Sequence, residues 1–337
     1  MAKWTIKDIA KKAGVSITTV SRVLNRKEEG MSAQTREKVL RVIEELEYQP
    51  NRLARGLVTK QSKLIGLIVP TISNPFFPEL CRGAEDEANK YGYSLVICNS
   101  DASAEKEERY IKILKEQQVD GIILSSQSGL SSASLDRHSK NLHYVLLDRM
   151  EREKVPGVFL ENEEGGYLAG QHLIQLGHKK MACITGPESI KNSRDRLKGF
   201  KRALKEVGLE PTIIREGDFS LESGYSHAKE ILENENVSAI FTCNDLMACG
   251  VYRAAHEMGV GIPQDISVIG FDDIPLISAL IPKLTTIRQD TYMMGRKSAE
   301  LLIQQIEHGK TDFTIFSPTL VVRESTAYVK TGEETIK

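Results

Sequence analysis

The sequence has few cysteines and no long run of apolar residues. Its 337 residues include five cysteines, and no two of them form a Cys-x-x-Cys pair. This odd, scattered set predicts neither a disulfide framework nor a metal site, so we expect buried free thiols. No apolar stretch approaches the roughly 18 residues of a membrane span, and the N-terminus lacks the apolar segment of a secretory signal. We therefore expect a cytoplasmic protein that has no membrane partner.

Common catalytic and cofactor signatures are missing as well. The sequence contains no Gly-x-x-x-x-Gly-Lys-Ser/Thr loop, no His-Glu-x-x-His and no Gly-x-Ser-x-Gly. Gly259-x-Gly261 lacks the third glycine of a dinucleotide fingerprint. Asp272 and Asp273 resemble an acid–base pair, but neighbours on an extended chain point to opposite sides. We expect no enzyme activity, no cofactor and no metal.

Net charge is also small, since 45 Lys and Arg stand against 46 Asp and Glu, which gives −1. The two signs are unevenly distributed along the chain. Residues 1–63 hold eight Lys and six Arg against one Asp and six Glu, a net +7, so the remaining 274 residues carry −8. A basic N-terminal part on an acidic body indicates nucleic-acid binding confined to one end.

Two short helices joined by a glycine turn are expected within this basic part. Residues 5–13 begin with a capping threonine and place apolar side chains at helical spacing. Gly14 ends that helix, and Ser16 can cap a second one over residues 17–24. A small helical domain in which Ser and Thr only cap helices is the alternative. The spacing favours a helix-turn-helix.

The second helix has the side chains that a DNA-reading helix needs. Its outward face carries Ile17, Thr18, Ser21 and Arg22. Hydroxyl groups can approach phosphates, an apolar group can meet a thymine methyl, and arginine can contact guanine through two hydrogen bonds. Ser32 can start a third helix that closes a small core.

A fourth, short basic helix is expected after Pro50. Asn51 could cap it, and its two turns are too short to be stable alone, because helix nucleation is costly. It is either an amphipathic linker or a helix that folds on DNA and inserts Leu57 into the minor groove.

These motifs resemble the headpiece of LacI/GalR-family transcriptional repressors. The resemblance covers residues 3–58 and includes Ala13-Gly14-Val15-Ser16, the run from Thr19 to Asn25, and Pro50-Asn51-x-x-Ala54-Arg55-x-Leu57. It implies base contacts from Ile17, Thr18 and Arg22, phosphate contacts from Ser16, Thr19, Ser21 and Asn25, and a minor-groove wedge at Leu57. The DNA-binding residues that we expect are Thr5, Ser16, Ile17, Thr18, Thr19, Ser21, Arg22, Asn25, Asn51, Ala54, Arg55 and Leu57.

From residue 64 onward, short apolar runs alternate with amphipathic stretches. The runs include residues 64–69, 94–98 and 121–124, and amphipathic stretches such as 78–91 and 194–207 lie between such runs. Apolar strands that alternate with helices specify parallel sheets covered on both faces. About ten strands exceed one comfortable sheet, so we expect two doubly wound lobes.

Ligands of such sheets bind beyond the carboxyl ends of the strands, and these ends are polar here. A sugar ring has apolar faces and a rim of hydroxyls that donate and accept hydrogen bonds. It suits aromatic walls combined with carboxylates, amides and guanidinium groups. For any single residue, a helix cap is an equally good interpretation, and the convergence of many favours a binding site.

The body also resembles the family's effector-binding core, which looks like a periplasmic sugar-binding protein. Asn74–Phe77 and Leu147-Asp148-Arg149 are similar to ribose-responsive members. Two carboxylates, Asp148 and Asp272, offset two arginines, Arg149 and Arg196, so a neutral sugar is favoured over a diphosphate. A sugar acid or a monophosphate stays open, because either arginine can engage it. The effector-binding residues that we expect are Asn74, Phe76, Phe77, Ser125, Asp148, Arg149, Arg196, Phe219, Asn244, Asp272 and Gln289.

The sequence therefore predicts an all-α helix-turn-helix headpiece followed by an α/β periplasmic-binding-protein-like core of two doubly wound parallel-sheet lobes. The expected divisions are the headpiece at 1–50, a hinge helix and linker at 51–63, an N-lobe at 64–161 with 291–318, and a C-lobe at 162–290 with 319–330.

The predicted function is a homodimeric repressor that binds double-stranded operator DNA and responds to a small sugar, with ribose or a similar pentose favoured. Two alternatives stay open: a carbon-catabolite regulator controlled by a phosphorylated carrier protein, and a regulator whose ligand acts as co-repressor. A tetramer is disfavoured because residues 326–337 lack leucine heptads.

Overall fold

The structure is a computed structural model, and it describes residues 4–24, 30–48, 61–126, 142–148 and 155–329. The chain divides into two compact units, Met1–Ser62 and Lys63–Lys337. No helix in the described ranges is both long and apolar enough to cross a membrane.

The described residues of the first unit form three helices, α1 (Ile6–Ala13), α2 (Ile17–Leu24) and α3 (Ala33–Glu45). Gly14 ends α1 in the left-handed conformation, with φ of 58°, which glycine adopts without steric cost. The Ser16 and Ser32 side chains accept hydrogen bonds from the backbone N–H groups of Thr19 and Thr35, as expected for N-caps. The predicted helix-turn-helix is confirmed. Its small core consists of Ile9, Ala10, Ala13, Val20, Val23, Val39 and Val42.

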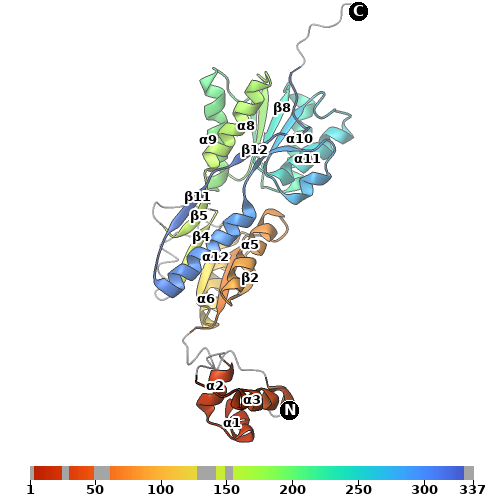
Figure 1. The fold of residues 1–337 in the computed structure, drawn as a ribbon. Coiled ribbons are helices and arrows are strands. Elements are labelled where there is room, and N and C mark those ends of the chain that lie inside the picture. The colour runs from red at the N-terminus through yellow and green to blue at the C-terminus, as the bar shows by residue number, and fades with distance from the viewer. Residues whose placement is uncertain (1–3, 25–29, 49–60, 127–141, 149–154, 330–337) are drawn as a thin grey trace, which may run out of the picture. The chain divides into compact units, whose positions relative to one another are not determined.

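The second unit contains two six-stranded sheets. The first, which we call the N-lobe sheet, has the order β11-β5-β4-β3-β1-β2, and all its strands are parallel. Helices α5 (Phe76–Lys90) and α12 (Thr291–His308) lie side by side along it, and α6 (Ala104–Glu116) also packs on it (Figure 1). Its strands are β1 (Leu64–Val69), β2 (Ser94–Asn99), β3 (Gly121–Leu124), β4 (His143–Leu147), β5 (Gly157–Leu160) and β11 (Phe313–Phe316).

The C-lobe sheet has the order β12-β10-β9-β8-β6-β7. Only β12 is antiparallel to its neighbour among these strands. Its strands are β6 (Met181–Thr185), β7 (Ile213–Glu216), β8 (Ala239–Thr242), β9 (Ser267–Asp272), β10 (Thr285–Arg288) and β12 (Thr319–Val321). The accompanying helices are α8 (Asn162–Gln175), α9 (Lys191–Glu206), α10 (Leu221–Asn234), α11 (Asp245–Glu257) and the 3-10 helix η1 (Pro275–Ala279).

The chain crosses between the sheets three times, after β5, after β10 and between β11 and β12. The two-lobed α/β fold is therefore confirmed, with twelve strands in the described residues where about ten were expected. The exact limits of the headpiece, hinge and lobes stay a prediction.

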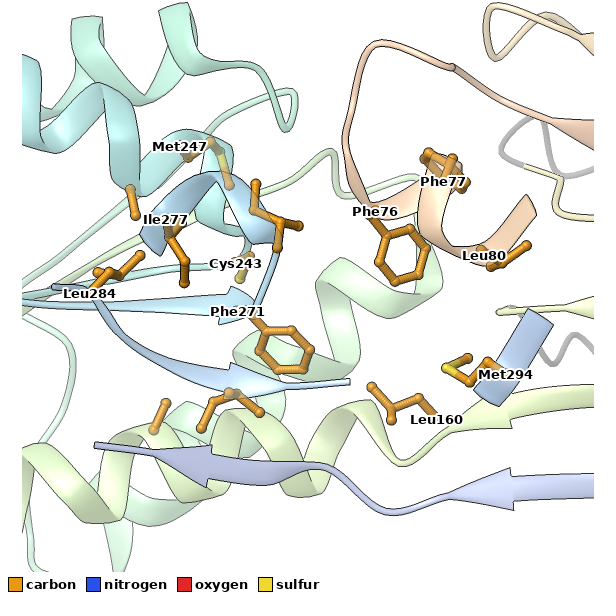
Figure 2. Close-up of a cluster of buried hydrophobic side chains, with 14 of the residues drawn as sticks. Phe76, Phe77, Leu80, Leu160, Cys243, Met247, Phe271, Ile277, Leu284 and Met294 are labelled. Atoms are coloured by element: carbon orange, nitrogen blue, oxygen red, sulfur yellow. The ribbon is translucent and has the colours of Figure 1, made fainter. Parts of the chain in front are cut away.

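One continuous hydrophobic cluster extends through both lobes. Figure 2 shows part of it, with Phe76 and Phe77 in the first turn of α5 and Phe271 at the end of β9. The Phe76 and Phe77 rings meet edge to face, with centroids 5.0 Å apart. Phe76 and Phe77 belong to the N-lobe and Phe271 belongs to the C-lobe, so this one cluster includes aromatic side chains from both lobes.

All five cysteines are buried and free, as expected. Burial raises the pKa of the Cys81 and Cys249 thiols to about 11, so both are protonated at neutral pH. These residues act as small apolar side chains.

Helices α8 and α9 pack unusually closely, and this contact fixes the helix that carries Arg196. A Cβ atom built on Gly199 would lie 1.8 Å from the backbone oxygen of Glu163, and one on Gly166 would lie 1.9 Å from the backbone oxygen of Arg196. Only glycine allows the two backbones to approach this far.

We predict that Gly199→Ala lowers the free energy of unfolding by about 1–3 kcal/mol, because the added methyl group forces α9 away from α8. Urea unfolding followed by circular dichroism measures the change. Lys201→Ala, an exposed position on the same helix, is the control and should change stability by less than about 0.5 kcal/mol. Equal stability of Gly199→Ala and the parent would show that α8 and α9 do not need this contact.

Candidate ligand cleft and nucleic-acid interface

Helix α2 buries one face and leaves the expected base-contacting side chains on the other. Val20 and Val23 lie in the headpiece core, whereas Thr18 and Arg22 are exposed and Ile17 is 45% exposed. An exposed isoleucine on a short helix is available to a partner surface. This arrangement suits a helix that enters a major groove.

Hydroxyl groups at the helix starts are organised by local hydrogen bonds. Ser16 Oγ lies 2.8 Å from Thr19 Oγ1, and Thr5 donates from its backbone N–H and its hydroxyl to Asp8. The Thr5 hydroxyl holds the pKa of Asp8 below its ordinary value. Thr5, Ser16 and Thr19 therefore have capping roles whether or not they also contact phosphates.

Several expected residues lie outside the described part of the chain. For DNA binding these are Asn25, Asn51, Ala54, Arg55 and Leu57, and for the effector site Arg149.

A cleft of about 270 Å³ lies between the lobes at the carboxyl ends of both sheets. Nine of the expected effector residues line it: Asn74, Phe76, Phe77, Asp148, Arg196, Phe219, Asn244, Asp272 and Gln289. The sequence-based prediction thus places most of its candidates around a single cavity.

Arg196 is the most extensively bonded side chain in the cleft, and it is only 4% exposed. Its Nε donates to Asn162 Oδ1 at 2.8 Å, and its Nη1 donates to the Cys243 carbonyl at 2.6 Å. Its guanidinium lies 3.7 Å from the centroid of the Phe271 ring, a cation–π contact. The position of Arg196 is therefore set before any ligand arrives.

Asp272 provides a carboxylate beside this guanidinium. Its Oδ1 accepts from Gln289 Nε2 at 2.6 Å and lies 3.4 Å from Arg196 Nη1. Burial raises the pKa of Asp272 to about 7, against the opposing effects of Arg196 and Gln289. Gln289 Oε1 is buried and has no hydrogen-bond partner in the described structure, so it is positioned to accept from a ligand.

Aromatic side chains on two sides of the cleft are held by neighbouring polar groups. Asn74 Oδ1 accepts from the Phe76 N–H at 3.0 Å at the start of α5. Across the cleft, Phe219 has a left-handed backbone with φ of 69°, and its carbonyl accepts from Asn244 Nδ2 at 2.9 Å. Asn244 therefore positions an aromatic wall in addition to capping α11.

One of the expected effector residues does not line the cleft. Ser125 is fully buried at the end of β3 but is not among the residues that line the cleft. Asp273 is bonded to Arg288 and Arg323, each at 2.6 Å, and it too does not line the cavity. The adjacent pair Asp272 and Asp273 therefore does not form an acid–base pair in the site.

Comparisons with known proteins decide the family. Residues 5–51 match the family of bacterial regulatory proteins named after LacI, and residues 62–319 match the periplasmic binding proteins and sugar-binding domain of that family. The chain belongs to the LacI family. It is a DNA-binding transcriptional regulator with a sugar-binding core, and its relatives are named as regulators, not as enzymes.

Individual relatives match most of this chain. It is 43% identical to the "Ribose operon repressor" of Halalkalibacterium halodurans, over 96% of this chain and 97% of that one. A lac repressor dimer bound to operator and an anti-inducer superposes with a TM-score of 0.88 at 33% identity, covering 97% of this chain and 100% of that one. A LacI-family regulator from Enterococcus faecium with bound ribose gives 0.73 at 34% identity, covering 79% and 100%.

Six cleft residues of this LacI-family core are not among the effector-binding residues expected from the sequence. Asp218 and Ser220 flank the expected Phe219 after strand β7, so polar residues at a strand end were the available signal. Asn192 carried no such signal, because the expected helix began at residue 194 and the observed one begins at Lys191. The complete set is Thr71, Ser73, Asn192, Asp218, Ser220 and Leu246.

Asp218 changes the charge balance of the cleft. The described lining contains three carboxylates, Asp148, Asp218 and Asp272, against the guanidinium of Arg196. Burial would raise the pKa of Asp218, but hydrogen bonds from Ser220 and Ser223 outweigh it and hold that pKa below its ordinary value. Even without counting Asp272, which keeps a proton up to about pH 7, Asp148 and Asp218 outnumber the single described guanidinium, and this disfavours a phosphorylated ligand. Within the described residues, no His, Cys, Asp and Glu side chains gather in a group suited to a metal ion.

We predict that Asp272 makes the free energy of unfolding fall as pH rises. The folded protein keeps a proton on Asp272 up to about pH 7, whereas the unfolded chain loses it near its ordinary value of 3.8. Stability from this group is therefore present at low pH and is lost as pH rises through 7. From pH 5 to 8, Asp272→Asn should gain about 2.5 kcal/mol of unfolding free energy relative to the parent.

Urea unfolding of both proteins at several pH values measures this difference. The comparison cancels groups that do not interact with Asp272, such as His172 and His178, whose pKa values burial lowers. A difference that is constant with pH would contradict the prediction.

Proposed function

We propose that the protein is a repressor that releases its operator when a ribose-type sugar binds in the cleft. The observation that carries this proposal is the composition of the cleft. Phe76, Phe77 and Phe219 offer apolar ring faces, and carboxylates, amides and one buried guanidinium surround a cavity of about 270 Å³. Such a small cavity suits a single sugar ring.

The individual polar groups match the needs of a neutral polyol. Sugar hydroxyls can donate to Asp148, Asp272 and the Gln289 carbonyl oxygen, and Arg196 can donate to a sugar oxygen. Each of these groups is buried, so a ligand lacking the matching hydroxyl leaves a buried group unsatisfied. The ribose operon repressor of H. halodurans and the ribose-bound regulator of E. faecium support ribose as the first choice.

The DNA-binding half of the proposal rests on α2. Its exposed Ile17, Thr18 and Arg22 would read base edges, while Ser16, Thr19 and Ser21 would meet phosphates. Asn25 and the hinge residues Asn51, Ala54, Arg55 and Leu57 would extend this interface, with Leu57 entering the minor groove. Sugar binding changes how the lobes close, and this change would weaken hinge ordering on DNA.

We also propose that the protein acts as a homodimer, as a single short recognition helix reads only one half-site. The second unit exposes apolar side chains suited to such a contact. Ile97 on the edge strand β2 is 50% exposed, and Ile281 beyond η1 is 92% exposed. The lac repressor that superposes on this chain was solved as a dimer on operator. A phosphorylated carrier protein as partner stays a prediction.

Calorimetry on the full-length protein tests the sugar. We expect D-ribose to bind at least tenfold more tightly than ribose 5-phosphate, because a phosphate dianion would meet the carboxylates of the cleft. Phe219→Ala should weaken binding at least tenfold, and Ser125→Ala, the control outside the cleft, should leave it unchanged. Tighter binding of the phosphate ester or of a nucleobase would reject the neutral-sugar assignment.

The same protein samples show whether the sugar weakens or strengthens operator binding. An operator is first selected from a random duplex library, and fluorescence anisotropy then measures its affinity with and without D-ribose. We expect ribose to weaken operator binding about 10- to 100-fold, in line with typical coupling energies of 1–3 kcal/mol. Tighter operator binding with ribose would identify a co-repressor instead.

The dimer is tested with Ile97→Asp, which places a charge on the exposed edge strand. Sedimentation velocity should show a monomer, with operator affinity reduced at least tenfold because two half-sites are no longer bound together. Val207→Asp, a substitution at an apolar residue that is 52% exposed elsewhere, is the control and should remain dimeric. Persistence of the Ile97→Asp dimer would place the interface on another surface.

A further inference from the structure

A hydrogen-bonded pair joins the two lobes inside the cleft. Asn192, in the first turn of α9, donates from Nδ2 to Asp148 Oδ1 at 2.9 Å and to the Asp148 carbonyl oxygen at 3.2 Å. Asp148 follows strand β4 of the N-lobe, whereas α9 belongs to the C-lobe.

Both partners are buried, at 5% exposure for Asn192 and 6% for Asp148. A hydrogen bond to a buried carboxylate is stronger than one between neutral groups, since the charge would otherwise be left unsatisfied. The contact can therefore influence how the lobes sit relative to each other.

The geometry on the N-lobe side is unusual. Asp148 has a left-handed backbone, with φ of 72°, which non-glycine residues seldom adopt. In this conformation its carbonyl and its carboxylate both reach the same amide nitrogen. The strain of such a backbone persists only where surrounding contacts hold it, and Asn192 makes two of these contacts.

The C-lobe side is rigid. Asn192 and Arg196 are four residues apart and so share one face of α9. Arg196 is tied to Asn162 and to the Cys243 carbonyl, and Gly199 lets α9 pack directly on α8. Asn192 is therefore presented to Asp148 from a fixed helix.

We propose that Asn192 is a positioning residue that holds the lobes closed and orients the Asp148 carboxylate before a ligand binds. A carboxylate accepts several hydrogen bonds, so Asp148 can bond Asn192 and a ligand hydroxyl together. The chemical class of the ligand, a small polyol, rests on the proposed function. The closing contact itself is independent of which sugar binds.

The expected consequence for affinity follows from the population of the closed state. Apparent affinity falls in proportion to the fraction of protein that is closed before binding. Loss of a hydrogen bond to a charged group favours the open state by about tenfold or more, so Asn192→Ala should weaken sugar binding by a similar factor.

Spin-label distance measurements on the full-length protein test closure without any ligand. Lys112→Cys on α6 and Lys229→Cys on α10 place labels on exposed positions of the two lobes. The native cysteines are buried, which keeps them from competing for the label. We expect the unliganded parent to populate the closed distance, and D-ribose to raise that population further.

In the same background, Asn192→Ala should give a longer and broader distance without sugar and return to the parent distance with saturating D-ribose. Lys191→Ala is the matched control, because Lys191 pairs with Asp195 on its own helix, and it should behave like the parent. An unchanged distance in unliganded Asn192→Ala, or an open unliganded parent, would overturn the proposal. If Asn192→Ala opens but ribose does not restore closure, the closing role stands and the ribose assignment fails.

A second variant separates a specific hydrogen bond from general packing. Asn192→Asp has nearly the same shape but places a carboxylate against Asp148. Two adjacent carboxylates repel each other until they share a proton, so this variant should be open at pH 8 and closed near pH 5.5. The unliganded parent should stay closed at both pH values.

Among the described residues, charged groups near this pair include Arg196, Asp218 and Asp272 in the cleft and Lys191 and Asp195 on α9. All are common to both proteins, so a pH effect confined to Asn192→Asp reports the pair itself. A pH-independent distance in this variant would contradict a hydrogen bond between residues 192 and 148.

Discussion

The buried guanidinium of Arg196 is the constraint on which the rest of the cleft depends. Moving a charged side chain out of water costs several kcal/mol unless hydrogen bonds and an opposite charge replace its hydration. Arg196 meets this demand with Asn162, the Cys243 carbonyl, Asp272 and the face of Phe271. These partners come from α8, the end of β8 and the end of β9, so satisfying one side chain fixes three elements around one point.

The fixed position of Arg196 affects residues on both sides of the cleft. Along α9 it orients Asn192 toward the N-lobe, and at β9 it sets the Asp272 carboxylate against Gln289. Gln289 lies at the crossover after β10, so the second lobe is coupled to the chain segment that leads into α12. A ligand that bonds to Asp148 and Asp272 therefore acts on both lobes. This provides a physical route from sugar binding to lobe geometry.

Much of this architecture could be predicted from the sequence, because periodicity and strand-end chemistry are local properties. Apolar runs such as residues 64–69 identified buried strands, and the polar residues after them converged because parallel strands end at one edge of the sheet. Gly14 and Ser16 likewise defined the helix-turn-helix, through a left-handed turn and an N-cap. The family resemblance added the roles of individual residues.

What could not be predicted depends on contacts between segments far apart in the chain. The sequence-based prediction missed Asn192 because α9 begins at Lys191, three residues before the start that the amphipathic pattern suggested. In addition, its hydrogen-bond partner Asp148 is 44 residues away in the chain. Ser125 follows a strand end as several lining residues do, but it is fully buried and does not line the cleft. Only the packed structure distinguishes a strand end that faces the cleft from one that does not.

The central claim is that a ribose-type sugar is bound by buried charges supplied by both lobes. A crystal structure of the full-length protein with D-ribose tests it most directly. The account predicts one sugar in the cleft, with hydroxyls bonded to Asp148 and Asp272, an oxygen bonded to Arg196, and its ring beside Phe219. A sugar bound to one lobe alone, or bound away from these carboxylates, would contradict it.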